Sequence, residues 1–343
     1  MRRRLLLGSA ATLLCPAMAM AAPAAPPLEL LIAGPSGRET SRWGEACALA
    51  FSPCLPGTPS INTQNIGGLD GVSGANQFDA LVPPDGKTAA ILPGAALIAY
   101  LTGGPRVHFD PTRWVPVLAG VNSGVLMLRR ALLAAGTSAL RAAPPLRLAA
   151  DQPQSRDLAG MLGLARLGIA ATPVFGMRDT DTKIRAFTAS EVDAVFLCGE
   201  GVPEDVSSLT AAGAAPLFDI GQLQPNGGIG PDPLFPGLPD ASSLGPAISP
   251  AINTAYLAAA TAAQLDFVVV LPRLTAPAAA NGWIQAAAKA ITSPALSAAA
   301  TASAVTLQPA PALGGALKTL ALQQAAQTTM LAYLAKTCGW QPG

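Results

Sequence analysis

Short apolar runs alternate with amphipathic segments along the first hundred residues. The run LELLIA at 28–33 has the length of a buried strand and stops at a Gly-Pro-Ser-Gly turn. The apolar residues after this turn recur at the spacing of one helix face, in a helix that starts near Arg38. They are Trp43, Cys47, Ala50 and Phe51. The pattern therefore predicts a strand followed by a helix.

The order of a strand followed by a helix is repeated in the next segment. INTQN at 61–65 is a predicted strand, a glycine-rich loop follows it, and a helix then runs through Phe78. TAAIL at 88–92 is a third predicted strand. Strands that alternate with helices form right-handed βαβ units, whose strands lie parallel in one sheet. The N-terminal part is thus predicted to contain a parallel sheet.

A second series of elements begins near residue 123. LRLAA at 146–150 and VDAVFL at 192–197 are predicted strands, and the second has the apolar density of a sheet covered on both faces. Ser155 is the predicted N-cap of a helix between them. The apolar face of that helix consists of Leu158, Met161, Leu162 and Ala165.

The C-terminal third returns to a strand and then to helices. Residues 222–250 are rich in Pro and Gly and are predicted to form a surface connection, and AQLDFVVVLP at 263–272 is a predicted strand. Helices are predicted to fill most of 276–336. One long final helix would carry Leu313, Leu317, Leu320, Met330, Leu331 and Leu334. Two α/β lobes are the simplest architecture for this order, and 343 residues suffice for both.

The N-terminus has the three parts of a secretory signal peptide. Arg2, Arg3 and Arg4 form a basic region, an apolar stretch follows at 5–14, and A-x-A cleavage sites end at residues 19 and 21. The apolar stretch is too short to span a bilayer. We therefore predict a signal peptide at 1–21 and a periplasmic protein. The basic region leaves export by the Sec or the twin-arginine route open, and a short buried helix is the alternative interpretation.

Charge and cysteine usage narrow the function further. Removing the three leader arginines leaves 21 − 3 = 18 basic residues against 20 acidic ones, which gives no reason to expect nucleic acid or an anionic membrane as partner. Four cysteines remain, without a CxxC pair. In an oxidising periplasm a disulfide between Cys47 and Cys54 is predicted, and four buried free thiols are the alternative.

No catalytic motif is complete. The GKT at 86–88 lacks the first glycine of a P-loop, because Leu81 occupies that position. Gly68, Gly71 and Gly74 have a G-x-x-G-x-x-G spacing, which is not that of the dinucleotide fingerprint.

The remaining reactive residues form no recognisable group. His108 is the only histidine, no G-x-S-x-G turn is present, and the carboxylates show no spacing typical of a glycosidase or a metal cage. We therefore predict no catalytic residue, no cofactor and no bound metal.

Three junctions between a strand and a helix carry the positive evidence for a ligand. They lie at 34–38, 66–71 and 151–156, where helix N-termini follow the carboxyl ends of strands. Ligands of open parallel sheets bind at this edge, and free N–H groups with the positive end of a helix dipole favour an anion there. Arg38 and Arg156 are placed to add charge-assisted hydrogen bonds to a carboxylate.

At these residues the chain resembles the substrate-binding proteins of tripartite tricarboxylate transporters, also called the Bug family. The similar segments are NIGGLDGVSGANQFDALVPPDGKTAAIL, HFDPTRWVPV, FPGLPDASSL and LPRLTAP, at 65–92, 108–117, 235–244 and 271–277. Two motifs depart from the family: Arg38 occupies the position of an aspartate in the first loop, and TPVFG at 172–176 replaces its "VPY-x-G".

The resemblance implies a bilobal type 2 periplasmic binding fold, with two parallel-rich sheets flanked by helices and a ligand cleft that closes by hinge motion. Lobe 1 would comprise 28–122 and 246–343, and lobe 2 would comprise 123–245. The implied partners are a small organic anion of the carboxylate type and the membrane permease subunits of a transporter. The protein itself is predicted to be a monomer.

Twelve residues are predicted to line the ligand cleft. The first loop supplies Gly34, Ser36, Gly37 and Arg38; the glycine-rich loop supplies Gly67, Gly68, Asp70 and Gly71; the middle lobe supplies Gln152, Ser155, Arg156 and Asp193. A structural role is the alternative for Asp193.

Two other functions fit an exported protein of this size. One is an enzyme on a similar α/β scaffold, with Asp70, Asp193 or Cys198 as its reactive group. The other is a ligand-sensing subunit of a membrane signalling protein.

Overall fold

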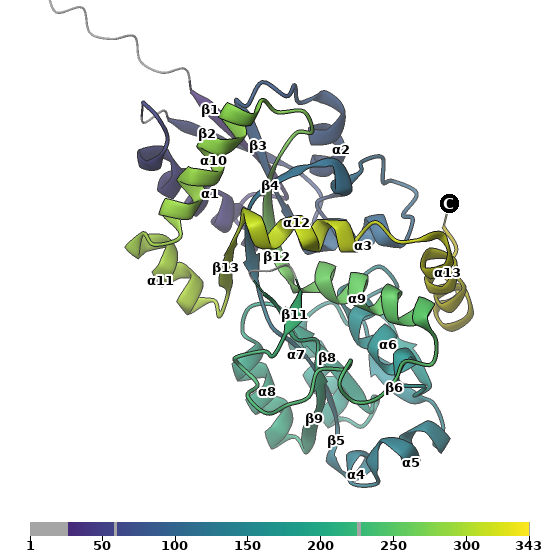
Figure 1. Cartoon of the computed structure of the whole chain (residues 1–343). Helices are drawn as coiled ribbons and strands as arrows, with labels where there is room; N and C mark the ends of the chain where they lie inside the picture. Colours follow the sequence, from purple (N-terminus) through teal and green to yellow (C-terminus); the bar gives the residue numbers. More distant parts are fainter. Residues whose placement is uncertain (1–26, 58–59, 225–227, 343) are drawn as a thin grey trace, which may run out of the picture.

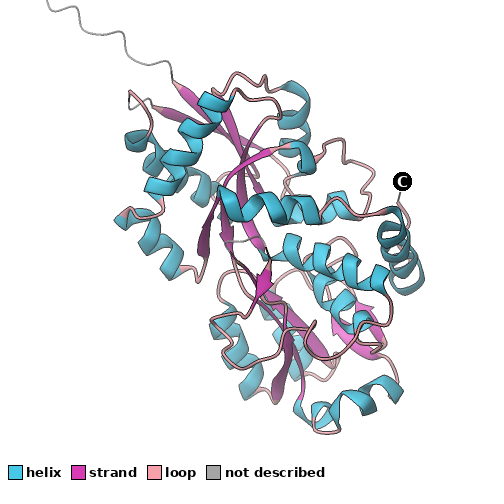
Figure 2. Ribbon diagram, viewed as in Figure 1, coloured by secondary structure: helices cyan, strands magenta, loops and turns pink. Residues whose placement is uncertain are grey.

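The computed structural model describes residues 27–57, 60–224 and 228–342, so the predicted signal peptide lies outside the described residues. Eleven of the described strands form two sheets, which occupy the upper and lower parts of the molecule in Figure 1. Helices flank both sheets (Figure 2). The predicted fold class, α/β with two sheets, is confirmed.

The first sheet has six strands. Their order is β13 (Thr306–Pro309), β4 (Val115–Val121), β12 (Leu265–Leu271), β3 (Thr88–Pro93), β1 (Leu28–Ala33) and β2 (Ile61–Ile66). β1 pairs in parallel with β2 and β3, as predicted for three consecutive βαβ strands. The ladders between β12 and β3, β12 and β4, and β13 and β4 are antiparallel, so the sheet is mixed.

The second sheet has five strands. Their order is β7 (Ala171–Val174), β6 (Leu146–Ala149), β8 (Ala194–Cys198), β5 (Gly124–Arg129) and β9 (Ala214–Asp219). β6 lies parallel to both β7 and β8, whereas β5 is antiparallel to β8 and β9. A short hairpin, β10 (Gln222–Leu223) and β11 (Ile229–Gly230), belongs to the Pro- and Gly-rich connection.

The described residues form thirteen α-helices and two short 3-10 helices. In the N-terminal half they are α1 (Glu39–Phe51), η1 (Ser52–Cys54), α2 (Val72–Leu81), α3 (Gly94–Leu101), η2 (Pro111–Arg113), α4 (Arg130–Leu133), α5 (Gly136–Ala142) and α6 (Asp157–Arg166). Those that follow are α7 (Thr180–Thr188), α8 (Val202–Ala211), α9 (Pro250–Gln264), α10 (Pro277–Ala290), α11 (Pro294–Ala302), α12 (Ala310–Thr319) and α13 (Gln324–Cys338).

Three predictions about the helices were wrong. The helix after 150 has Arg156 as its N-cap, because the Ser155 hydroxyl donates to the Gln152 carbonyl at 2.8 Å instead of capping. The predicted single C-terminal helix is two, α12 and α13, separated at residues 320–323. Residues 263 and 264 end α9 and do not begin the strand.

An alanine-rich helix joins the two halves of the molecule. α9 contacts α6 and α13 as well as α3, and it lies between the two sheets in Figure 1. Its alanines at 258, 259, 260, 262 and 263 are all buried. Small side chains allow neighbouring helices to approach closely, and the largest apolar cluster therefore runs through both halves of the chain.

The first residue of α3 is a glycine for a steric reason. A Cβ at Gly94 would lie 2.2 Å from the Leu265 carbonyl oxygen and 2.3 Å from that of Ala262. We expect Gly94→Ala to lower the free energy of unfolding by about 1–3 kcal/mol, because backbone atoms cannot move aside as a flexible side chain can. Urea denaturation followed by circular dichroism measures this change.

Gly282 provides the matched control, since it lies inside α10 with open space around the position of a Cβ. Gly282→Ala is expected to raise stability by about 0.5–1 kcal/mol through helix propensity. Equal effects of the two substitutions would contradict the steric explanation.

Candidate functional site

The carboxyl ends of strands from the two sheets meet where α1 and the β8–α8 connection touch. Glu200, which follows β8, accepts a hydrogen bond from the Arg42 guanidinium at 2.9 Å and one from the Trp43 indole N–H at 3.2 Å. Arg42 and Trp43 lie on α1, directly after β1. These bonds connect the edge of the first sheet to the edge of the second.

Arg156 forms a second connection at this edge. As the N-cap of α6 it follows β6, and its guanidinium lies 3.5 Å from Asp266 Oδ1 at the start of β12. It also donates to the carbonyls of Leu265 and Asp266 at 3.4 Å. The Asn122 amide, in the turn between β4 and β5, donates to the same Asp266 oxygen at 2.9 Å.

Glu39, Glu200 and Asp266 form an acidic cluster here, which we call the carboxylate cluster. Carboxylate oxygens of the three residues lie within 4.8 Å of one another. The Asp266 side chain is fully buried. The Glu39 and Asp266 carboxyl groups share a side-chain hydrogen bond, and apart from that bond Glu39 Oε1 and Asp266 Oδ2 have no hydrogen-bond partner among the described residues.

The environment of Glu39 favours its protonated form. Burial, the hydrogen bond to Asp266 and the neighbouring negative charges raise the pKa of Glu39 from 4.5 to about 8, against a lowering effect of Arg156. Desolvation disfavours the ionised carboxylate, and like charges add to this effect. Glu39 is therefore largely protonated at neutral pH.

Cys198 lies beside the cluster and is not a reactive thiolate. Its thiol donates to Asn122 Oδ1 at 3.3 Å and contacts the Ala263 carbonyl at 3.2 Å. Burial raises the pKa of Cys198 to about 12. Because the thiolate is the nucleophilic form, this residue gives no support to an enzyme at neutral pH.

The first predicted loop lies at the edge of the site. Gly34 is buried, and its carbonyl accepts from the Asn65 amide at 3.2 Å, which ties the ends of β1 and β2 together. Ser36, Gly37 and Arg38 are exposed. The Arg38 side chain makes no ion pair or hydrogen bond with another described residue, and Arg38 is the N-cap of α1.

In the glycine-rich loop, some glycines are exposed and one is packed closely against a neighbouring strand. Gly67 and Gly68 are exposed. Gly71 has φ 73°, and a Cβ there would lie 2.6 Å from Pro93. Asp70 accepts from the Val72 N–H at 3.2 Å at the start of α2, and its other oxygen pairs with Arg106.

The middle-lobe residues are divided between two edges of the second sheet. Gln152, Ser155 and Arg156 lie at the start of α6, on the same edge as the cluster. Asp193 precedes β8, at the opposite edge, and forms a two-pronged ion pair with Arg147 at 2.9 and 2.7 Å. The structure does not bring Asp193 to the site, and these contacts fit the alternative structural role.

Sequence reasoning missed the three carboxylates of the cluster. Asp266 had a visible signal, because it is a single acid inside an otherwise apolar strand, and buried charges need partners. Glu39 and Glu200 had none, since each is an acid at a helix start, where a surface carboxylate is common.

The predicted disulfide between Cys47 and Cys54 is absent. All four cysteines of the described residues are free thiols. Cys47 is fully buried in the apolar cluster under α1, and burial raises the pKa of its thiol to about 12.

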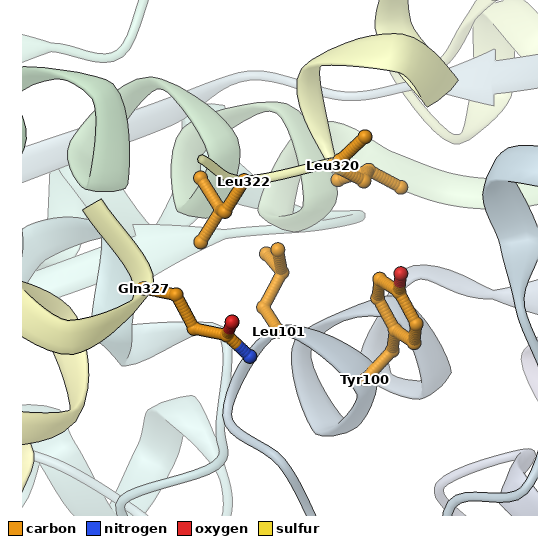
Figure 3. A pocket seen from close by; sticks show the side chains of 6 residues that line it. Tyr100, Leu101, Leu320, Leu322 and Gln327 are labelled. Atoms are coloured by element: carbon orange, nitrogen blue, oxygen red, sulfur yellow. The ribbon is translucent and has the colours of Figure 1, made fainter. Parts of the chain in front are cut away.

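A separate cavity of about 260 Å³ lies between the end of α3 and the α12–α13 connection (Figure 3). It is lined by Tyr100, Leu101, Leu320, Ala321, Leu322 and Gln327. None of the predicted site residues or cluster carboxylates lines it. Its lining offers no cationic group for an organic anion.

Solved structures resemble this chain over almost its full length. A crystal structure of a TctC solute-binding protein from Polaromonas, without ligand, has a TM-score of 0.69 at 14% identity, over 91% of this chain and 98% of that one. This chain has the fold of a periplasmic solute-binding protein. MatC from Rhodopseudomonas palustris, with bound malate, has a TM-score of 0.54 at 15% identity, over 90% and 98% of the two chains.

A third structure, of an R. palustris protein with adipate, has a TM-score of 0.51 at 19% identity, over 92% and 97%. At these identities the likeness establishes the solute-binding fold alone. The sequence matches no protein-family model and no curated protein. No helix in the described part of the chain is long and apolar enough to cross a membrane.

Proposed function

We propose that the protein is a periplasmic solute-binding protein that captures a small organic anion of the carboxylate type. It would deliver this solute to the membrane permease subunits of a tripartite tricarboxylate-type transporter, acting as a monomer after removal of residues 1–21. Lobe 1 would comprise 28–122 and 246–343, and lobe 2 would comprise 123–245. No catalytic activity is proposed.

The observation that carries this proposal is the meeting of four helix starts at one edge of both sheets. α1 and α2 follow β1 and β2, while α6 and α8 follow β6 and β8. Contacts between Arg42 and Glu200, and between Arg156 and Asp266, connect the two sets. Unpaired N–H groups and helix dipoles favour an anion at such a place.

The fold supports the same class of ligand. Two proteins of this fold are described with malate and with adipate, both of which are dicarboxylates. In this chain Arg156 is already paired with Asp266, so the cation best placed for a solute is the exposed Arg38 at the start of α1.

Calorimetry with the mature chain tests the proposal against malate, adipate and citrate. We expect saturable binding of at least one of them, and we expect Arg38→Ala to weaken it by about tenfold or more, the effect of one hydrogen bond to a charged group. Arg273→Ala is the control, because Arg273 follows β12 at the edge opposite to Asp266.

Absence of binding to all three acids by a folded protein would contradict the proposed function. Binding that Arg38→Ala leaves unchanged would contradict only the role of that arginine.

A further inference from the structure

The starts of α1 and α2 lie side by side at the edge where the solute is proposed to bind. β1 and β2 are neighbouring parallel strands, and the Asn65 amide at the end of β2 donates to the Gly34 carbonyl at 3.2 Å and to the Ser41 hydroxyl at 3.1 Å. A Cβ at Gly71, directly before α2, would lie 3.1 Å from the Ala33 carbonyl oxygen at the end of β1. A solute held at the start of α1 would therefore reach the glycine-rich loop.

The start of α2 already holds a carboxylate of the chain itself. Asp70 Oδ1 accepts a hydrogen bond from the Val72 N–H at 3.2 Å, at the first residue of the helix, and Asp70 Oδ2 pairs with the Arg106 guanidinium. A carboxylate at a helix N-terminus satisfies an unpaired N–H group and the positive end of the helix dipole. Asp70 thus occupies the place that an anionic group of a solute would take at this helix.

The segment that carries Arg106 is fixed to the same helix. Asn76 belongs to α2, and its amide donates to the Arg106 carbonyl at 2.7 Å, while its Oδ1 accepts from the His108 N–H at 2.8 Å. These contacts hold the backbone of Arg106 without using its side chain. The guanidinium would therefore stay beside residue 70 even if that residue lost its charge.

The starts of α6 and α8 hold acids of the chain as well. Asp157, in the first turn of α6, accepts from the Asp151 N–H at 3.0 Å and pairs with Lys183. Glu204 and Asp205 lie in the first turn of α8. Negative charge of the chain is thus already present at the starts of α2, α6 and α8, and it disfavours an additional anion there.

α1 differs from these three helices. The acid in its first turn, Glu39, is largely protonated at neutral pH, because burial and the neighbouring Asp266 raise its pKa to about 8. The N-cap residue Arg38 is exposed, and within the described part of the chain its side chain forms no capping hydrogen bond. The start of α1 therefore combines a helix dipole, an available cation and a neutral first-turn acid, which together provide one place for one carboxylate.

We propose that the solute is a monocarboxylate, bound through its carboxylate at the start of α1, and that Asp70 excludes a second carboxylate. A second carboxylate that reached the glycine-rich loop would be repelled by Asp70, and displacing Asp70 would break its pair with Arg106. Leu69 is 73% exposed beside Asp70, so an apolar remainder of the solute would gain by covering it. This inference rests on the proposed function and assigns its substrate class.

Hexanoate and adipate test the inference, because they have equal chain lengths and differ by one carboxylate. In calorimetry with the mature chain at neutral pH, we expect both to bind, and hexanoate to bind about tenfold or more tightly. Asn accepts from the Val72 N–H as Asp does, so Asp70→Asn keeps the turn before α2 and releases Arg106 for a second carboxylate. We expect this variant to bind adipate about tenfold more tightly and hexanoate as before.

Two further variants separate the role of Asp70 from a general charge effect. Adding Arg106→Gln to Asp70→Asn is expected to abolish the gain for adipate, because that gain depends on the released guanidinium. Asp85→Asn is the matched control: Asp85 also accepts from the N–H two residues later, at 2.9 Å, and pairs with Lys87, but it precedes β3 at the opposite edge of the first sheet. We expect it to leave both affinities unchanged.

Each possible failure has a different meaning. Binding of adipate as tight as that of hexanoate in the parent protein would overturn the inference and leave the proposed function standing. An Asp70→Asn variant that is folded by circular dichroism and gains nothing for adipate would overturn the exclusion by Asp70. Absence of binding to both acids would count against the proposed function itself, and the inference would fail with it.

Discussion

Replacing Arg156 with methionine is expected to lower the free energy of unfolding by about 3–5 kcal/mol. The guanidinium is four-fifths buried, with 21% of the side chain exposed, and its partner Asp266 is fully buried. Methionine fills a similar volume but leaves the Asp266 carboxylate without its cation, in the place where Glu39 and Glu200 add further negative charge. Urea denaturation at neutral pH, followed by circular dichroism, measures the loss.

Two controls separate burial from charge. Arg42→Met removes the other arginine of the site, but 58% of the Arg42 side chain is exposed, so a loss of about 0–1 kcal/mol is expected. The double variant Arg156→Met with Asp266→Leu removes both buried charges and should recover most of the lost stability. A loss in Arg156→Met no larger than that in Arg42→Met would show that the buried pair is not a main determinant of stability.

Rising pH is expected to destabilise the protein between about pH 4.5 and pH 8 through Glu39. The pKa of this carboxyl rises from 4.5 in the unfolded chain to about 8 in the fold, mainly through burial and then through Asp266. Within this range the folded state binds more protons than the unfolded one, so the free energy of unfolding falls as pH increases. At about 1.36 kcal/mol per pH unit the total reaches roughly 2–5 kcal/mol.

Glu39→Gln isolates this contribution, because glutamine keeps the shape but does not titrate. We expect the variant to match the parent near pH 4.5 and to exceed it in stability by roughly 2–5 kcal/mol above pH 8. Asp219, whose pKa burial raises to about 6, contributes in the same direction at lower pH in both proteins. Parallel stability curves for the two proteins would contradict the assignment to Glu39.

The local pattern of the sequence predicted individual elements well. LELLIA, INTQN and TAAIL are strands with the predicted starts. LELLIA and TAAIL are short, mostly apolar runs, whereas INTQN is mostly polar and largely exposed. Three βαβ strands also gave the correct parallel pairing of β1 with β2 and β3. The start of the helix at 39 follows from the turn before it, whereas the helix at 157 begins one residue later than the predicted N-cap Ser155 implies.

The sequence pattern did not predict which strands from distant parts of the chain pair with one another. β12 is as apolar as a parallel strand, yet it pairs antiparallel to β3 and β4, because the chain returns to the first sheet after passing through the second. The short strand β13 lies at the edge of the first sheet, pairs with β4, and has no periodic signal of its own. The alanine-rich helix α9 is almost entirely apolar, so it shows little amphipathic contrast in the sequence.

The sequence by itself determined the strands and helices from residue 28 to residue 92 and the glycine-rich turns before α1 and α2, since these depend on residues close together in the chain. Only the tertiary structure decided which charges meet. Asp193 lies at the opposite edge of the second sheet, where it pairs with Arg147. Glu39, Glu200 and Asp266 lie close together, and Asp266 pairs with Arg156. Residues 39, 200 and 266 are distant in sequence, and burial and pairing of charge depend on the three-dimensional packing that brings them together.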